Sequence, residues 1–241
     1  MRVAALYDVH GNLPALEAVL AEVEQEAPDV VLVGGDVSAG AFPAECLELL
    51  RSLGDRAVWV RGNCDRVLAE GGADHGLADA WCGAQLSEQQ RAFLGGLPPS
   101  VVLEVDGLGP VLFCHASPRS DEEILTQRSP ETRLEAALAG VRERTVVHGH
   151  VHVAYERELG RYRVISPGSL GMPYADAPGA YWGMFGPGYE PRRTAYDLEA
   201  AAERIRGTGW PRSEEIAAEN VLTVPGADEA IDLFERMAAA G

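Results

Sequence analysis

The stretch that most constrains this chain is TVVHGHVH, residues 145–152. Its β-branched start predicts the end of a buried strand, and the histidines that follow predict a loop. Gly149 lets the backbone bend, so the imidazoles of His150 and His152 can reach one place from adjacent positions. A bent pair at this spacing suits two neighbouring metal ions, whereas His-x-x-x-His on a helix holds one zinc ion. The stretch alone equally fits a strand end whose histidines are hydrogen-bonded or exposed.

Working outward, the same sequence of a strand and then polar residues recurs three times near the N-terminus. Apolar runs predict strands at 3–7, 30–33 and 57–60, and helical periodicity predicts helices at 13–26 and 43–53. The strands end in the polar groups Asp8-Val9-His10, Gly34-Gly35-Asp36 and Gly62-Asn63-Cys64-Asp65. This alternation predicts an α/β layered fold with a largely parallel first sheet, whose site lies at the carboxyl ends of the strands.

The rest of the chain predicts one irregular segment among further strands and helices. Residues 66–100 look irregular apart from a helix that Ser87 caps, and they predict a cap-like insertion. Later elements are a hairpin at 101–114, strands at 162–165, 180–185 and 193–196, and helices at about 131–138, 197–206 and 228–239. We expect a single domain over 1–241, with a helical C-terminal extension at about 197–241. The apolar stripe of that extension fits a lid or a homodimer contact.

The composition of the chain excludes some classes of function. The chain has 241 residues and a net charge of −17, and all 20 of its basic residues are arginine. An acidic surface repels phosphate backbones, so we expect a small phosphorylated substrate rather than polymeric nucleic acid. The absence of lysine excludes a Schiff-base or P-loop lysine. Its N-terminus starts directly in a strand pattern and no apolar run reaches the length of a membrane span, so we expect a cytoplasmic protein without membrane contact.

The strand-end polar residues form a set with metal-binding chemistry: Asp8, His10, Asp36, Asn63, His115, His150 and His152. Imidazole, carboxylate and amide oxygen without thiolate suit Mn, Fe, Co, Ni or Zn. Two such ions need a shared ligand, and Asp36 is the candidate bridge because it lies in the middle of the set. A bridging water made acidic by two ions could attack phosphorus directly. No serine or cysteine stands beside a base to form a covalent intermediate.

Asp-x-His, Gly-Asp, Gly-Asn-x-Asp, a lone histidine after a strand and Gly-His-x-His, in this order, resemble the calcineurin-like metallophosphoesterase superfamily. Within it, the chain is most similar to the small bacterial and archaeal predicted phosphodiesterases. The resemblance covers roughly residues 1–170. It implies a four-layer α-β-β-α sandwich of two mixed sheets flanked by helices.

The resemblance also implies roles for individual residues. It places one metal ion on Asp8, His10, Asp36 and His152, and the other on Asp36, Asn63, His115 and His150. Asp36, Asn63 and His150 would serve catalysis together with a metal-bridging hydroxide. The chain departs from the family at Cys64, where phosphatases have a histidine that protonates the leaving group, and at Ser166, where asparagine is usual. A thiol is a weak donor, so Cys64 favours substrates with low-pKa leaving groups.

Four other residues keep more than one interpretation each. His75 lies in a glycine-rich loop and is either exposed or the missing acid. Arg66 and Arg119 either clamp a phosphate or form surface ion pairs with Asp121 or Glu122. His148 either supports a ligand or packs in the core, or else takes part in catalysis itself.

We expect a phosphodiesterase acting on phosphodiesters or phosphoanhydrides of small molecules, with dinucleoside polyphosphates as one candidate substrate. A phosphomonoesterase or protein phosphatase is the alternative within the enzymes, and Cys64 speaks against it. A metal-binding interaction module without catalysis is the alternative outside them. A hydrolase with a single metal ion would not need both His150 and His152.

Overall fold

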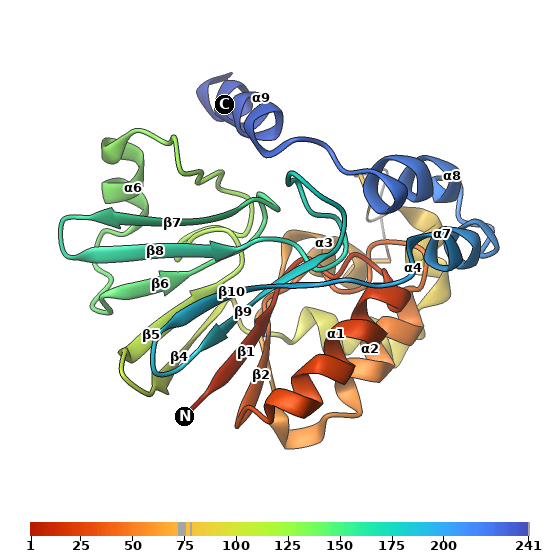
Figure 1. Ribbon diagram of the computed structural model, residues 1–241, viewed down its shortest axis with the longest axis horizontal. Helices are drawn as coiled ribbons and strands as arrows, with labels where there is room; N and C mark the ends of the chain where they lie inside the picture. The colour runs from red at the N-terminus through yellow and green to blue at the C-terminus, as the bar shows by residue number, and fades with distance from the viewer. Residues whose placement is uncertain (72–75, 78, 241) are drawn as a thin grey trace.

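Two mixed five-stranded sheets face each other in the computed structural model, which describes residues 1–71, 76–77 and 79–240 (Figure 1). The first sheet has the order β10-β9-β1-β2-β3, in which β1, β2 and β3 are parallel and β9 and β10 antiparallel. Its strands are β1 (Val3–Leu6), β2 (Val30–Val33), β3 (Ala57–Trp59), β9 (Ala180–Phe185) and β10 (Tyr189–Thr194). The parallel arrangement predicted for the first three strands is therefore confirmed.

The second sheet has the order β4-β5-β6-β8-β7, with β5, β6 and β8 parallel and the two edge strands antiparallel. Its strands are β4 (Ser100–Val105), β5 (Gly109–Cys114), β6 (Thr145–Val147), β7 (Ala154–Leu159) and β8 (Tyr162–Pro167). Like the first sheet, it has a parallel centre, so several strands of each sheet end at a common edge.

Helices cover the outer faces of both sheets (Figure 1). The first sheet is covered by α1 and α2, and the second by α6. Side chains of β1 alternate between two cores: Ala4 and Leu6 pack under the helices, whereas Val3, Ala5 and Tyr7 pack between the sheets. The helices are α1 (Leu13–Glu26), α2 (Pro43–Arg51), α3 (Asn63–Ala69), α4 (Ala80–Gln85), α5 (Glu88–Gly95), α6 (Glu131–Ala137), α7 (Leu198–Arg206), α8 (Ser213–Ile216) and α9 (Ala227–Ala240). The four-layer sandwich is confirmed.

Side-chain caps explain where several helices begin. The Asn12 side chain accepts a hydrogen bond from the Ala15 amide at the start of α1. The Ser87 hydroxyl accepts one from the Gln90 amide at the start of α5. Short 3₁₀ and π-helical segments, η1 (Gly54–Arg56) and η2 (Ala217–Leu222), complete the described elements.

Three local predictions differ from the structure. The segment predicted to be irregular from residue 66 begins inside α3, which starts at Asn63. Strand β7 was not predicted, because Arg157 interrupts the inward apolar face of Tyr155 and Leu159. Strand β10 starts four residues earlier than the predicted 193, since it pairs with β9 along its length. In each case pairing or packing with a distant segment overrides the local pattern.

The C-terminal segment packs onto both halves of the molecule. Helix α7 packs beside α1, and α9 lies at the end of the molecule opposite the N-terminus (Figure 1). In the α9 stripe, Ile231 is buried and Phe234 half-buried against the same chain, while Met237 is exposed. None of the helices in the described ranges combines the length and apolar character needed to cross a bilayer.

Candidate metal centre

The loops after five strands bring all seven predicted ligands to one edge of the sandwich. Those after β1, β2 and β3 come from the first sheet, and those after β5 and β6 from the second. All but one of the side chains are buried, and the exception is half-buried His150. The residues brought together are Asp8, His10, Asp36, Asn63, His115, His150 and His152.

The backbone at this centre is strained. In the described part of the chain six non-glycine residues have a positive φ, and five of them belong to the predicted ligands. Left-handed backbone costs an L-residue about 1–3 kcal/mol, so it persists only where the surroundings impose it. Those five residues are Asp8, His10, Asp36, His150 and His152.

Gly149 is needed because a side chain would not fit here, whereas the sequence predicted that it would let the backbone bend. The left-handed conformation falls on His150 (φ 68°) and His152 (φ 57°) instead. A Cβ atom at Gly149 would lie 2.5 Å from both the Asp8 Oδ2 and Tyr7 Cδ1 atoms. Glycine is therefore required here because the two sheets approach closely.

Three histidines are held in one tautomer by backbone carbonyls. Nδ1 of His10 lies 3.3 Å from the Ala39 oxygen, that of His115 2.9 Å from the Gly34 oxygen, and that of His152 2.9 Å from the Met172 oxygen. Because carbonyls only accept, each Nδ1 carries the proton when the ring is neutral.

Neutral His10 and His152 then present the lone pairs of their Nε2 atoms to the centre. The Nε2 atoms of His10 and His152 are 3.0 Å apart, a contact that two lone pairs disfavour and a cation relieves. The donor set and its orientation therefore fit a metal ion.

Asp36 lies between two groups of ligands. Its Oδ2 atom is 3.7 Å from Nε2 of His10 and 3.5 Å from Nε2 of His115. On the His115 side, the Asn63 Oδ1 atom lies 3.0 Å from His115 Nε2 and 3.1 Å from His150 Nδ1. In this position an amide oxygen can bind a cation, whereas with the amide turned the Asn63 nitrogen donates to both imidazoles. Asp8 also lies between the two groups, with Oδ1 3.6 Å from His152 Nε2 and 3.9 Å from His115 Nε2.

Burial and mutual charge shift the protonation of these groups. Burial raises the pKa of Asp8 to about 8 and lowers that of His150 to about 4. Burial alone would lower the pKa of His115, but the carboxylates of Asp36 and Asp8 outweigh it and raise the value to about 10. Asp36 shifts the other way, because the charge of His115 overcomes the effect of burial. Without a cation, His115 and Asp36 form a buried ion pair.

Asp65 holds the loops that carry two of the ligands. Its carboxylate accepts the amides of Gly62 at 2.9 Å, Asp36 at 2.8 Å and Val37 at 3.0 Å. The amide of Cys64 donates to Asp36 Oδ1 at 2.8 Å. These bonds fix the carboxylate of Asp36 relative to the start of α3.

Cys64 itself faces the small cavity at the centre. That cavity has a volume of about 220 Å³. Burial and the charge of Asp36 raise the pKa of the Cys64 thiol, so the thiol stays protonated near neutral pH. The cavity is lined by His10, Asp36, Asn63, Cys64, Gly76, Leu77, His150 and His152.

The two predicted substrate arginines are both engaged in ion pairs. Arg66 donates to Asp121, with Nε 2.8 Å from Oδ2, and to Glu122 at 2.7 Å. Arg119 pairs with Glu123, which was not among its predicted partners. The ion-pair interpretation is therefore the one present in the structure for both residues.

One predicted residue, His148, lies outside the ligand cluster. His148 Nε2 is 2.6 Å from the Tyr155 hydroxyl, and burial lowers the pKa of His148 to about 3. It packs in the core of the second sheet beside the centre. His75 falls outside the described residues.

Sequence reasoning missed how other side chains support the ligands. The ring of Tyr174 stacks on His152 with 5.3 Å between centroids, and the Ser169 hydroxyl donates to the Asp8 carbonyl at 2.8 Å. Ser166, in the place of the family asparagine, donates to the Val153 carbonyl at 2.7 Å. Nothing in the sequence around Tyr174 indicated a histidine partner.

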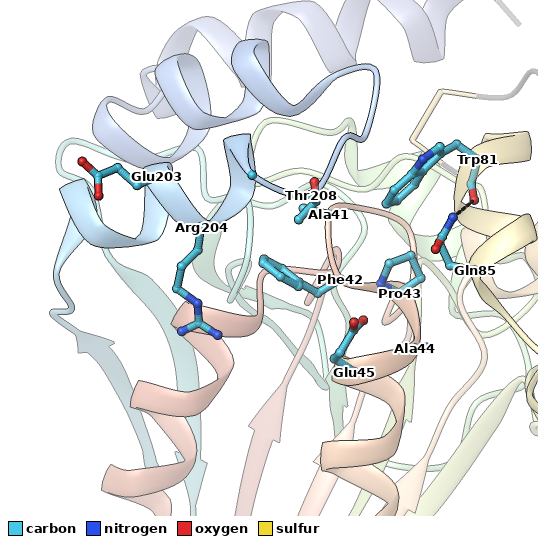
Figure 2. Close-up of a pocket in the computed structure, with 11 residues that line it drawn as sticks. Ala41, Phe42, Pro43, Ala44, Glu45, Trp81, Gln85, Glu203, Arg204 and Thr208 are labelled. Atoms are coloured by element: carbon cyan, nitrogen blue, oxygen red, sulfur yellow. Dashed lines mark hydrogen bonds between the residues drawn. The ribbon is translucent and has the colours of Figure 1, made fainter.

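A larger cavity of about 400 Å³ lies outside the ligand cluster (Figure 2). Figure 2 shows Phe42 and Pro43 at the start of α2, with Trp81 of α4 and Arg204 of α7 around them. Arg204 lies over the Phe42 ring at 5.6 Å and pairs with Glu17. No predicted ligand lines this cavity.

Known proteins are similar to this chain in sequence. Uncharacterized protein MJ0912 of Methanocaldococcus jannaschii is 29% identical over 229 residues, covering 84% of this chain and 91% of the relative. Phosphodiesterase YfcE of Escherichia coli K12 is 24% identical over 190 residues, covering 75% of this chain and 85% of the relative.

Solved structures agree in fold. A metallophosphoesterase from Sphaerobacter thermophilus has a TM-score of 0.73 at 24% identity, covering 92% of this chain and 98% of its own. Hypothetical protein PH1004 from Pyrococcus horikoshii has a TM-score of 0.75 at 22% identity, covering 90% and 97%. The family model of the calcineurin-like phosphoesterase superfamily domain matches residues 1–184, so the chain belongs to the calcineurin-like phosphoesterase superfamily.

Proposed function

We propose that this protein is a metal-dependent phosphoesterase that hydrolyses phosphodiester or phosphoanhydride bonds of small molecules with two metal ions. The observation that carries the proposal is the position of Asp36 between two groups of ligands, 3.7 Å from His10 and 3.5 Å from His115. Two ions bound there would neutralise charge on phosphoryl oxygens and make a water between them more acidic. Mn, Fe, Co, Ni and Zn all suit these ligands.

The chain's own residues orient the ligands and exclude water from behind them. Carbonyl groups of the loops fix the imidazoles of His10, His115 and His152, so little reorganisation is needed when a phosphate enters. Asp65 keeps the loop of Asp36 in place. Asn63 and His150 complete the side of the centre nearest His115.

Cys64 supports the proposal that the substrates have leaving groups of low pKa. Its protonated, high-pKa thiol lines the cavity at the position where the family's phosphatases have a histidine. Such a thiol transfers a proton poorly, so alkyl monoesters, whose leaving groups need one, should react slowly. Diesters with aryl leaving groups and phosphoanhydrides do not need that proton. The printed activity of the E. coli relative, phosphodiesterase, supports the same class.

The test compares manganese-dependent hydrolysis of bis(p-nitrophenyl) phosphate with that of p-nitrophenyl phosphate. We expect the diester to be preferred, and Asp36→Asn to lower its turnover about 100- to 1,000-fold, the range seen when one group that stabilises the transition state is lost. Preference for the monoester would overturn the proposed substrate class. Failure to hydrolyse either ester with any of the five metals would favour an interaction module.

Cys64→His sharpens that experiment. The substitution introduces an imidazole where the leaving group is expected, so hydrolysis of p-nitrophenyl phosphate should rise relative to the diester. Cys46→Ala, which removes a buried thiol far from the ligands, is the matched control and should leave the ratio unchanged. An unchanged ratio in Cys64→His would mean that Cys64 does not face the leaving group.

A further inference from the structure

A second polar groove, called the arginine groove here, adjoins the metal centre on the side of His115. It has a volume of about 370 Å³, and His115 forms part of its wall. The groove therefore opens directly onto one of the ligands. Its lining residues are Arg61, Arg66, Pro99, His115, Ser117, Pro118, Arg119, Ser120 and Asp121.

Two of its three arginines are already committed to neighbouring carboxylates. The Arg66 guanidinium spans both oxygens of Asp121, at 2.8 and 3.2 Å, and also reaches Glu122. Arg119 donates to both oxygens of Glu123 and, through Nη1, to the Ala136 carbonyl at 3.0 Å. Their charges are balanced locally, so neither offers a free fork to a ligand.

Arg61 is different. Among the residues that the structure describes, no carboxylate lies within 4.0 Å of its guanidinium, and its one side-chain bond runs from Nη1 to the Gly95 carbonyl at 3.3 Å. Its Nε atom is buried and lacks a partner among those residues, a feature that Arg56 and Arg192 share, so the missing carboxylate is what distinguishes Arg61. A buried N–H without an acceptor is unfavourable, and a guanidinium without a counter-charge attracts an anion.

The position of Arg61 is fixed by the chain on both sides. Its backbone amide donates to the Pro98 carbonyl at 2.8 Å, and Asn63 follows two residues later at the metal centre. Arg61 and one candidate metal ligand, Asn63, therefore belong to the same short segment between β3 and α3. Such a segment can hold two anionic groups of one molecule in register.

We propose that Arg61 in the arginine groove binds a second phosphate group of the substrate, beside the phosphate held at the metal centre. This inference rests on the proposed function and narrows it: the preferred substrates are small molecules that carry at least two phosphate groups. A guanidinium that lines the groove without a carboxylate partner among the described residues attracts a phosphate. The net charge of −17 disfavours a polymer with many phosphates as the source of the second group.

The test uses calorimetric titration of the manganese-loaded, full-length protein with thymidine 5′-monophosphate and with thymidine 3′,5′-bisphosphate. The wild type should bind the bisphosphate about 10- to 100-fold more tightly, the range for one hydrogen-bonded charged contact. Arg61→Ala should remove that preference, and Arg61→Lys, which keeps the charge without the fork, should keep part of it. Arg56→Ala is the matched control, because Arg56 lies at the other end of β3 and pairs with Glu24.

The outcomes separate this inference from the proposed function. Equal affinity of the wild type for the two nucleotides, or a preference that survives Arg61→Ala in a variant with an unchanged melting temperature, would overturn the role of Arg61. Hydrolysis of the p-nitrophenyl esters of the same two nucleotides is measured in parallel. Tight, Arg61-dependent binding of the bisphosphate without hydrolysis of either ester would support phosphate binding by Arg61 and overturn the enzymatic function.

Discussion

The loop between β2 and α2 contributes to two very different cavities. It carries Asp36 into the metal centre and, six residues later, Phe42 into the cavity of Figure 2. The second cavity is the larger, about 400 Å³ against about 220 Å³, yet none of the described residues lining it has left-handed backbone. At the centre, five predicted ligands do.

The difference teaches that backbone strain and unpaired lone pairs mark the site better than volume does. Ordinary packing of helices leaves hollows such as that between α2, α4 and α7. Left-handed conformation at five functional side chains has no such simple origin, because each instance needs stabilising contacts elsewhere. Four predictions test this contrast, beginning with the largest expected effect.

The largest effect is expected where the backbone of Gly35 lies close to Gly62 and His115, behind the ligands. Gly35 has a φ of +97°, and a Cβ atom there would lie 2.6 Å from the Gly62 nitrogen and 2.7 Å from His115 Nδ1. Gly35→Ala should displace His115 and lower diesterase activity about 10- to 100-fold, as loss of support to a ligand does. Steady-state kinetics with manganese measures it.

Gly209→Ala provides the control. Gly209 also has left-handed backbone, but no described atom lies within 4 Å of a Cβ built there. Its substitution should cost about 1–2 kcal/mol of stability and leave the kinetics unchanged. Equal loss of activity in both variants would show that left-handed backbone alone, rather than crowding at the centre, causes the effect.

Next in size is the loss of the ring that supports His152. Tyr174→Leu removes the stack on this imidazole while keeping an apolar side chain, and should weaken metal binding about 10-fold. Competition with a chelating dye measures the affinity. Tyr181→Leu is the matched control, because the Tyr181 hydroxyl donates to the Ala177 carbonyl and, among the described residues, its ring stacks on no histidine. The same affinity in both variants would contradict a supporting role for Tyr174.

A smaller, pH-dependent effect concerns the helix beside Tyr174. On α9, Glu235 accepts from Thr126 and Ser129, each at 2.7 Å, and pairs with Arg133. Burial would raise the pKa of Glu235, but these partners outweigh it and lower the pKa below its ordinary value of 4.5. Ionised Glu235 therefore adds its full share to the free energy of unfolding above pH 4.5. This stabilisation is lost as the pH falls through the lowered pKa of Glu235.

Glu235→Gln should thus lower the free energy of unfolding at pH 7 by about 1 kcal/mol, and the difference from the wild type should shrink in acid. Urea denaturation at pH 7 and at pH 3.5 measures both values. Glu229→Gln, an exposed position on the same helix, should change neither. A difference that grows in acid would contradict the assigned direction of the pKa shift.

The smallest effect on activity is expected in the larger cavity. Trp81→Leu should leave diester hydrolysis within about twofold of the wild type, because this side chain touches no ligand, while costing about 1–2 kcal/mol of stability through lost apolar burial. Kinetics and thermal unfolding together test it. A large loss of activity with unchanged stability would make the cavity of Figure 2 part of the functional site.

The clustering of the candidate ligands was predictable from the sequence because each one follows a strand of recognisable pattern, and parallel strands end at one edge. The same holds for α1 and α5, whose caps at Asn12 and Ser87 depend on neighbours three residues away. Such features arise from local chemistry, which the order of residues contains directly.

Only the tertiary structure decided the remaining features. The partners of Arg66 and Arg119, the uncommitted guanidinium of Arg61 and the stack of Tyr174 on His152 all join segments far apart in the chain. Strand β7 likewise exists because β8 pairs with it. Sequence determined which chemical groups arrive at the centre. Packing determined which of them are left unpaired, since a charge or a ring finds its partner only after distant segments have come together.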